Sequence, residues 1–237
     1  MGLFDFLSGS EEAQLRRHSK RMTNINSQHE DRMASAHWLA DNGSDAAIIG
    51  LLSRFSLTID SQMKDTTEKA LVTELLRGLG ERVLAPTTEW LRRNSNIAQP
   101  LRLIEEFGGE EGVVGVLLDL LARENDPFKT EKKRQLLIKL AEYQDARIAP
   151  AVMPVLNDFD EGVRYGAVEV LAAQDDPAVP AALAKRLADP EEDSNRLRGR
   201  VAEILHQRRW SLGEHAEAVA SNAPRGWQVQ GDRIGPA

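Results

Sequence analysis

An internal repeat in the second half of the sequence is the feature that most limits how this chain can fold. Segments 133–158 and 164–189 align at an offset of 31 residues. The apolar pairs matched at this offset are Leu140 and Leu171, Ile148 and Val179, and Leu156 and Leu187. A third copy follows at an offset of 34 residues, in which Ile204 and Leu205 continue the pattern. Repeats of this length are typical of a stacked array rather than of one globular core.

Each copy of the repeat reads as a helical hairpin. Val163, Ala167 and Leu171 recur at helical spacing and indicate a first helix. A polar turn at 175–178, which contains two aspartates and a proline, then interrupts the pattern. The apolar spacing resumes at Val179 and predicts a second helix. Stacking such hairpins would bury a continuous aliphatic core.

These residues resemble HEAT repeats and the HEAT-like repeats of the phycobilisome-lyase type. The shared pattern is an Asp-rich turn, a Val-Arg pair, and Ala and Leu on the first helix, matched here by Asp158, Asp160, Val163, Arg164, Ala167, Val170 and Leu171. The resemblance covers about residues 132–208. It implies an all-α fold, a right-handed α-solenoid of helical hairpins, in which Arg164 and Arg198 form a ladder of hydrogen bonds along the stack.

The rest of the chain divides around this array. Weaker helical pairs extend the predicted solenoid upstream, so that it spans 61–221, with helix stops at Gly78, Gly80 and Gly108-Gly109. Residues 1–60 lack the repeat and read as three helices of an N-terminal cap. Residues 222–237 are expected to form a short tail or a small hairpin, because the pattern alternates around a Gly-Asp turn.

Composition limits the partners and the compartment. Lysine and arginine total 30 against 37 aspartates and glutamates, so the net charge of -7 makes nucleic acid an unfavourable partner. The absence of cysteine excludes disulfides and thiolate metal sites and agrees with a cytoplasmic location. No apolar stretch approaches the 18 residues of a membrane span, so an integral membrane protein is not expected. Residues 1–8 are apolar enough to dock on the protein's own first helices, or peripherally on a partner or a membrane.

Motifs that would indicate catalysis do not occur in the sequence. The five histidines match no zinc-binding spacing, and no phosphate loop, dinucleotide fingerprint or nucleophile elbow is present. Adjacent carboxylates such as Glu191 and Glu192 diverge by about 100 degrees on a helix and are expected to be solvated. We therefore expect no metal, no cofactor and no enzymatic activity.

A basic cluster before Trp210 supports an alternative. It consists of Arg196, Arg198, Arg200, Arg208 and Arg209. HEAT-like DNA glycosylases hold damaged DNA with such arginines and with tryptophan, and bilin lyases also use HEAT-like repeats. Ion pairing with nearby carboxylates is the simpler interpretation of these arginines, because acidic residues surround them in the sequence.

The function predicted from the repeat is a non-enzymatic protein-binding module or assembly scaffold. In the resembling family the second helices of the hairpins line a concave face that contacts the partner. The exposed candidates on these helices are Trp90, Arg93, Glu89, Arg92, Arg147, Lys185 and Arg186. Trp90 and Arg93 come first, because tryptophan and arginine are enriched at interface hot spots, although Trp90 would serve equally well in the core.

Overall fold

The computed structural model describes residues 3–124, 126 and 130–237, and side chains within these ranges from Glu11 onward. The chain forms two compact units, unit 1 (Met1–Val116) and unit 2 (Leu117–Ala237). Both are helical, and the one sheet in the described part of the chain has two strands. The all-α prediction is therefore confirmed, whereas the division into cap, solenoid and tail stays a prediction.

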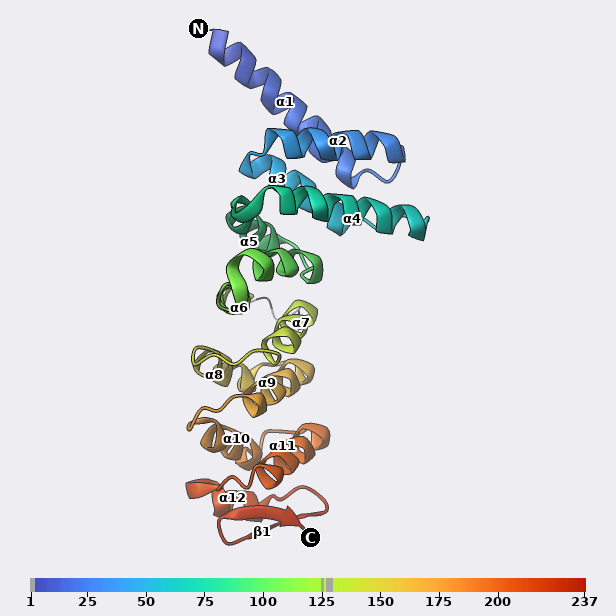
Figure 1. The fold of residues 1–237 in the computed structure, drawn as a ribbon. Helices are drawn as coiled ribbons and strands as arrows, with labels where there is room; N and C mark the ends of the chain where they lie inside the picture. The colour runs from blue at the N-terminus through green and yellow to red at the C-terminus, as the bar shows by residue number, and fades with distance from the viewer. Residues whose placement is uncertain (1–2, 125, 127–129) are drawn as a thin grey trace. The chain divides into compact units, whose positions relative to one another are not determined.

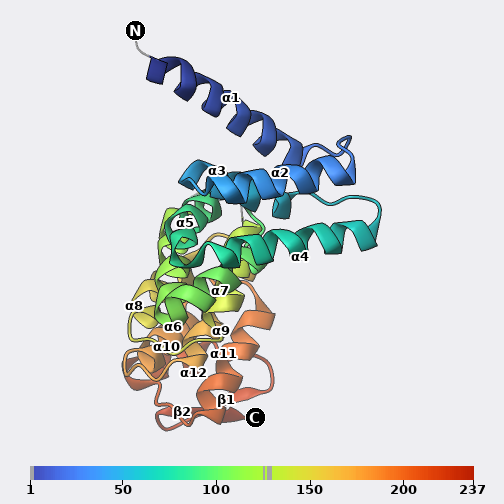
Figure 2. The ribbon, with the colours of Figure 1, turned by 45° about the horizontal axis from the view of Figure 1, so that its top comes forward.

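Unit 1 contains the helices of the first half of the chain. They are α1 (Leu3–Thr23), α2 (His29–Asn42), α3 (Asp45–Leu52), α4 (Gln62–Gly78), α5 (Leu84–Arg93) and the first part of α6 (Ala98–Arg123), with the 3₁₀ segments η1 (Ser53–Ser56) and η2 (Gly80–Val83). The apolar helix α3 packs against α1, α2 and α5. Figures 1 and 2 show α2 and α4 side by side within this unit.

Local sequence signals set the ends of these helices. Ser44 and Ser61 precede α3 and α4, and each side chain accepts a hydrogen bond from a backbone N–H of the first turn. Helix α4 ends at Gly78, and Gly80 follows with a φ of 62°. Gly109 interrupts α6 with φ 63° and ψ -173°, so α6 is two helices joined at this residue. The glycine stops predicted from the sequence are thus confirmed at Gly78, Gly80 and Gly109.

A fully buried carboxylate, Glu68 on α4, joins three helical segments of unit 1. Arg32 of α2 forms a bidentate ion pair with it, with both N–O distances 2.8 Å. Arg54 of η1 donates to it at 2.7 Å, and His29 Nδ1 lies 2.7 Å from it. Burial opposes the ionisation of Glu68, but hydrogen bonds from the two arginines and the histidine lower its pKa to about 2. Arg54 is also buried and pairs with Asp65 at 2.7 Å.

Unit 2 contains three helical hairpins in succession. The first helices are α7 (Thr130–Leu140), α9 (Glu161–Ala173) and α11 (Asn195–Gln207), and the second helices are α8 (Ile148–Val152) with η3 (Met153–Asn157), α10 (Val179–Ala188), and η4 (Gly213–His215) with α12 (Ala216–Ser221). Figure 1 shows the first helices in one layer and the second helices in another. This arrangement is the solenoid that the repeat predicts.

The repeat positions form the core of unit 2. Leu140, Leu171 and Leu205 occupy matched positions on the three first helices, and all are fully buried. Ile148 and Val179 match on the second helices and are also fully buried. Burial of aliphatic side chains at the same position in each copy is what allows one hairpin to stack on the next.

The C-terminal segment closes unit 2 with a β-hairpin. Strand β1 (Trp227–Gln230) pairs antiparallel with β2 (Arg233–Pro236). Gly231, with a φ of 65°, begins the two-residue turn between them. Ile234 of β2 is buried, and its carbonyl oxygen lies 3.1 Å from His206 Nδ1 on α11. The small hairpin predicted for the tail is confirmed.

Candidate functional site

A ladder of ion pairs connects the hairpins of unit 2. Arg134 of α7 forms hydrogen bonds of 2.7 and 2.8 Å with Asp160, which precedes α9. One repeat later, Arg164 of α9 forms bonds of 2.8 and 2.9 Å with Glu192, which precedes α11. Arg198 of α11 continues the series but donates to backbone carbonyl oxygens, those of Asp189 and Asn222. The ladder implied by the family resemblance is therefore present, with a glutamate in its second rung.

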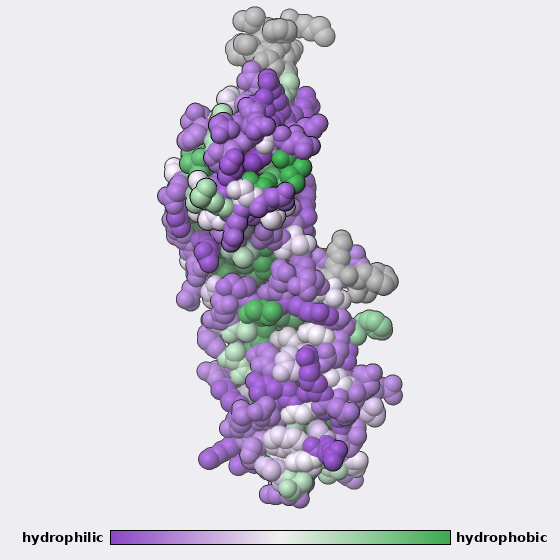
Figure 3. All heavy atoms as spheres, turned by 90° about the vertical axis from the view of Figure 1, so that its right-hand side faces the viewer, coloured by the Kyte–Doolittle hydropathy of each residue, from purple (hydrophilic) through white to green (hydrophobic). Residues whose placement is uncertain are grey.

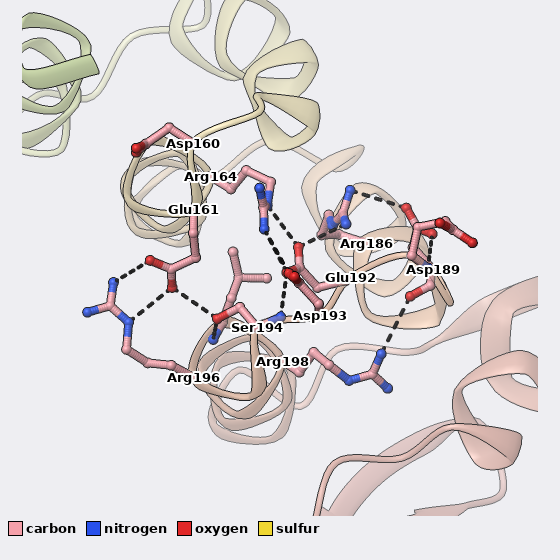
Figure 4. A network of polar contacts seen from close by, with 12 residues as sticks. Asp160, Glu161, Arg164, Arg186, Asp189, Glu192, Asp193, Ser194, Arg196 and Arg198 are labelled. Atoms are coloured by element: carbon pink, nitrogen blue, oxygen red, sulfur yellow. Dashed lines mark hydrogen bonds and ion pairs between the residues drawn. The ribbon is translucent and has the colours of Figure 1, made fainter. Parts of the chain in front are cut away.

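Glu192 is the centre of this network, as Figure 4 shows. Its side chain is fully buried and accepts from Arg164 of α9 and from Arg186 of α10, the latter at 2.8 Å. Burial opposes its ionisation, but hydrogen bonds from Arg164 and the backbone N–H of Ser194 lower the pKa of Glu192. The prediction that Glu192 is solvated was wrong, because the loop before α11 turns this carboxylate inward towards two arginines.

Most of the basic cluster before Trp210 is paired within unit 2. Arg196 pairs with Glu161 at 3.1 Å, and Arg200 with Glu169 at 2.6 Å. Arg208 pairs with Asp175 at 2.9 Å and lies over the ring of Trp210. Ion pairing therefore accounts for Arg196, Arg200 and Arg208. Arg198 donates to backbone carbonyl oxygens instead, and the side chain of Arg209 has no partner among the described residues.

A groove runs along the second helices of unit 2. It has a volume of about 550 Å³ and is lined by η3, α10 and η4. We name it the second-helix groove; its lining residues are Met153, Pro154, Leu156, Asn157, Ala182, Lys185, Arg186, Ala188, Asp189 and His215. A neighbouring hollow of about 380 Å³ shares Pro154 and Asn157 with it and continues towards α7. Both volumes are within the range of ligand-binding clefts.

Charge and apolar surface alternate in the second-helix groove. The side chain of Lys185 is exposed, and no ion pair or hydrogen bond joins it to another residue that the structure describes. Arg186 is 8% exposed and is held by Asp189 and Glu192, while its Nε has no hydrogen-bond partner among the described residues. A lysine beside alanine, proline and methionine side chains gives the groove a positive charge on a mostly apolar wall.

The opposite layer of unit 2 has a different surface. Figure 3 faces the first helices α7, α9 and α11, where the surface is mainly hydrophilic, with small hydrophobic areas between charged side chains. The hydrophobic Ile138 of α7 is 65% exposed on its own. Scattered apolar residues of this kind are normal on a protein surface.

Only two of the predicted binding residues line a common groove. Lys185 and Arg186 line the second-helix groove, whereas Arg147 lies in the turn before α8 and pairs with Asp145 at 2.7 Å. Arg186 was expected to be exposed and is buried instead, because its guanidinium group turns inward to Glu192.

The other predicted residues belong to α5 in unit 1. Trp90 is 3% exposed, so the expectation that it is exposed was wrong, and the core alternative describes its position. The apolar face of α5 turns it inward with Leu91. Glu89 is within 2.6 Å of Arg93 and 3.1 Å of Arg92, in ion pairs local to the helix. Binding of a partner by these residues stays a prediction.

No group of three histidine, aspartate or glutamate side chains in the described ranges is arranged to hold a metal ion. The histidines make local contacts instead: His18 stacks on Trp38 with ring centroids 4.4 Å apart, and His206 meets the ring of Trp227 edge-on at 5.7 Å. No helix in the part of the chain that the structure describes is long and apolar enough to cross a membrane. Residues 1–8 lie outside those whose side chains are described.

Sequence reasoning missed most of the second-helix groove. Met153 and Pro154 stand in the 3₁₀ segment η3, where no regular helical spacing marks a lining position. Ala182 and Ala188 have small side chains, which attract attention only when a hollow is known to lie above them. The one sequence feature that could have indicated Ala182 and Ala188 as lining residues is that they lie on the same second helix as Lys185.

The stacked hairpins and the arginine-acid ladder define the class of protein as a helical-repeat protein. The family model for HEAT repeats matches residues 114–203, which cover the ladder and most of the second-helix groove. The segment 114–203 therefore contains HEAT repeats, as the sequence pattern predicted. No curated protein and no solved structure matches the chain.

Proposed function

We propose that unit 2 is a non-enzymatic protein-binding module that holds a segment of a partner protein in the second-helix groove. HEAT repeats commonly serve as scaffolds for protein interaction. The observation that carries the proposal is the groove itself, about 550 Å³ in volume, with an exposed and unpaired Lys185 on an apolar wall. Such a wall with a few polar groups is the usual composition of a binding cleft.

The chemistry of the groove favours an extended peptide segment over a compact ligand. The second-helix groove and its neighbouring hollow share Pro154 and Asn157, so an extended chain that crosses η3 could occupy both. Apolar side chains of the segment would pack on Met153 and Ala182, and Lys185 would attract an acidic residue of it. We also propose, on the absence of cysteine, that the protein works in the cytoplasm.

Site-specific photo-crosslinking tests this proposal. A photoreactive phenylalanine derivative at Ala182 lies in the groove, and the same group at Ile138 on α7 serves as the control on the other layer. After irradiation in native lysate, we expect a discrete crosslinked protein from position 182 and not from position 138. The charge reversal Lys185→Glu should reduce the yield at position 182 by about tenfold, the change expected when one charge-assisted contact of about 1.4 kcal/mol is lost.

The proposal fails if position 182 gives no specific product, or if Lys185→Glu leaves the yield unchanged while the protein remains folded. A specific crosslinked protein from position 138 and none from position 182 would indicate that the partner binds the first helices. Crosslinked nucleic acid at position 182 would favour the alternative of a DNA-binding repeat protein.

A further inference from the structure

A second groove lies at the C-terminal end of unit 2, apart from the second-helix groove. It has a volume of about 520 Å³ and runs between the end of α11 and strand β2. It is lined by Leu205, His206, Gln207, Arg209, Gln230, Arg233, Ile234, Gly235 and Pro236. We name it the α11–β2 groove. None of these lining residues is acidic, whereas Asp189 lines the second-helix groove.

The positive charges of two arginines in the α11–β2 groove are not neutralised by nearby carboxylates. The side chain of Arg209 is exposed and forms no hydrogen bond or ion pair with another residue that the structure describes, unlike the side chains of the other arginines of its cluster. Among the described residues, the Arg233 side chain pairs only with its neighbour Asp232, at 3.9 Å, and both side chains are more than half exposed. An exposed pair at this distance neutralises little charge. The groove is therefore a locally positive site on a protein whose net charge is -7.

The backbone at Arg209 is a second, independent observation. Arg209 has a φ of 53°, the only positive φ of a residue other than glycine in the described ranges. Its N–H bonds to the carbonyl of His206, and the N–H of Trp210 bonds to that of Leu205, the pattern that ends a helix with a left-handed residue. Glycine is usual at this position, because an L side chain costs free energy there. Arg209 adopts this unfavourable backbone conformation although its guanidinium group has no partner within the described residues. We interpret this as a position suited to binding a group of another molecule.

The remaining lining residues suit a peptide. The amide side chain of Gln230 has no partner among the described residues and offers both a donor and an acceptor, as a peptide group does. Pro236 is exposed and contributes apolar surface to the groove, which the buried Ile234 and Leu205 also line. A phosphate polymer would be repelled by the acidic remainder of the protein, while a short acidic segment meets only the groove.

From these features we infer that the α11–β2 groove binds an acidic peptide segment, whose carboxylate groups pair with Arg209 and Arg233. The inference does not depend on the second-helix groove, because it rests on different residues. Arginine is suited to this contact, since its planar guanidinium group forms bidentate hydrogen bonds with carboxylates.

Binding of a fluorescein-labelled hexaglutamate peptide to the full chain, measured by fluorescence anisotropy at low ionic strength, tests the inference. A hexaglutamine peptide is the neutral comparison, and a single-stranded oligonucleotide of six residues is the phosphate comparison. We expect saturable binding of hexaglutamate, weaker binding of the oligonucleotide and no binding of hexaglutamine. The substitutions Arg209→Gly and Arg233→Gln should each weaken it about tenfold, the change expected for loss of one charge-assisted hydrogen bond.

Two controls separate binding from folding. Arg225→Ala removes one exposed arginine from the same region without touching the groove, and it should change the affinity by less than about twofold. Arg209→Gly relieves the left-handed backbone, so its thermal unfolding midpoint should equal or exceed that of the original chain. Absence of hexaglutamate binding, equal affinity in all variants, or tighter binding of the oligonucleotide would each overturn the inference.

Discussion

The two units of this protein stabilise buried charge in different ways. In unit 1, Arg32 and Arg54 converge on one carboxylate, Glu68, which no water reaches. In unit 2, ion pairs recur from repeat to repeat, and only the rung at Glu192 is fully buried. One arrangement concentrates the charges at a single point, and the other distributes them along the stack.

The difference arises because a repeat reproduces the same ion pair in successive copies. The rung between Arg134 and Asp160 recurs as Arg164 with Glu192, since equivalent residues meet equivalent neighbours in every copy. The Glu68 cluster has no such copies, and its partners come from positions without a common spacing, Arg32 and Arg54. Loss of one residue should therefore be most harmful in unit 1 and should become milder along the ladder of unit 2.

The largest effect is expected for Glu68→Gln. The substitution leaves the buried Arg32 without a carboxylate partner and leaves Arg54 with Asp65 alone, which should lower the free energy of unfolding of unit 1 by about 3–5 kcal/mol. Urea titration with pulsed hydrogen–deuterium exchange reads the two units separately. The control is Glu74→Gln, an exposed position on the same helix α4, which should cost less than about 1 kcal/mol. Equal effects of the two substitutions would contradict the importance assigned to the buried cluster.

An intermediate effect is expected for Glu192→Gln in unit 2. Arg164 and Arg186 lose their shared carboxylate, but Asp189 still pairs with Arg186, so about 2–3 kcal/mol should be lost, the range for hydrogen bonds to charged groups. The same exchange experiment measures the loss in the peptides of α9 to α11. Its neighbour Glu191 is exposed, and Glu191→Gln is the matched control. If both variants are as stable as the original, the ladder contributes nothing to the stack.

The smallest effect is expected for Arg134→Ala. Its ion pair with Asp160 lies at the surface, with the arginine side chain 41% exposed, so less than about 1 kcal/mol should be lost. Asp160 also accepts the N–H of Val163 and caps α9. Asp160→Ala should therefore cost about 1 kcal/mol more than Arg134→Ala in the same measurement. A larger loss for Arg134→Ala would show that the surface rung matters more than the cap.

Much of unit 2 could be predicted from its sequence. The offset between Leu140 and Leu171 identifies the repeat and the core positions, because aliphatic residues at fixed spacing have few ways to be buried. The alternation around Gly231 likewise predicts the terminal hairpin. The burial of Trp90 was not predictable, since a tryptophan on an amphipathic helix suits a core and a binding surface equally.

The sequence by itself determined the helical class, the repeat, its aliphatic core and the Asp-rich turns, since these depend on periodicity and local capping. Only the tertiary structure decided which charges are buried and which remain free. Glu192 and Glu191 are adjacent in the chain, yet one is enclosed by two arginines and the other is exposed. Arg208 and Arg209 differ in the same way, because a charged side chain finds its partner through long-range contacts that spacing does not encode.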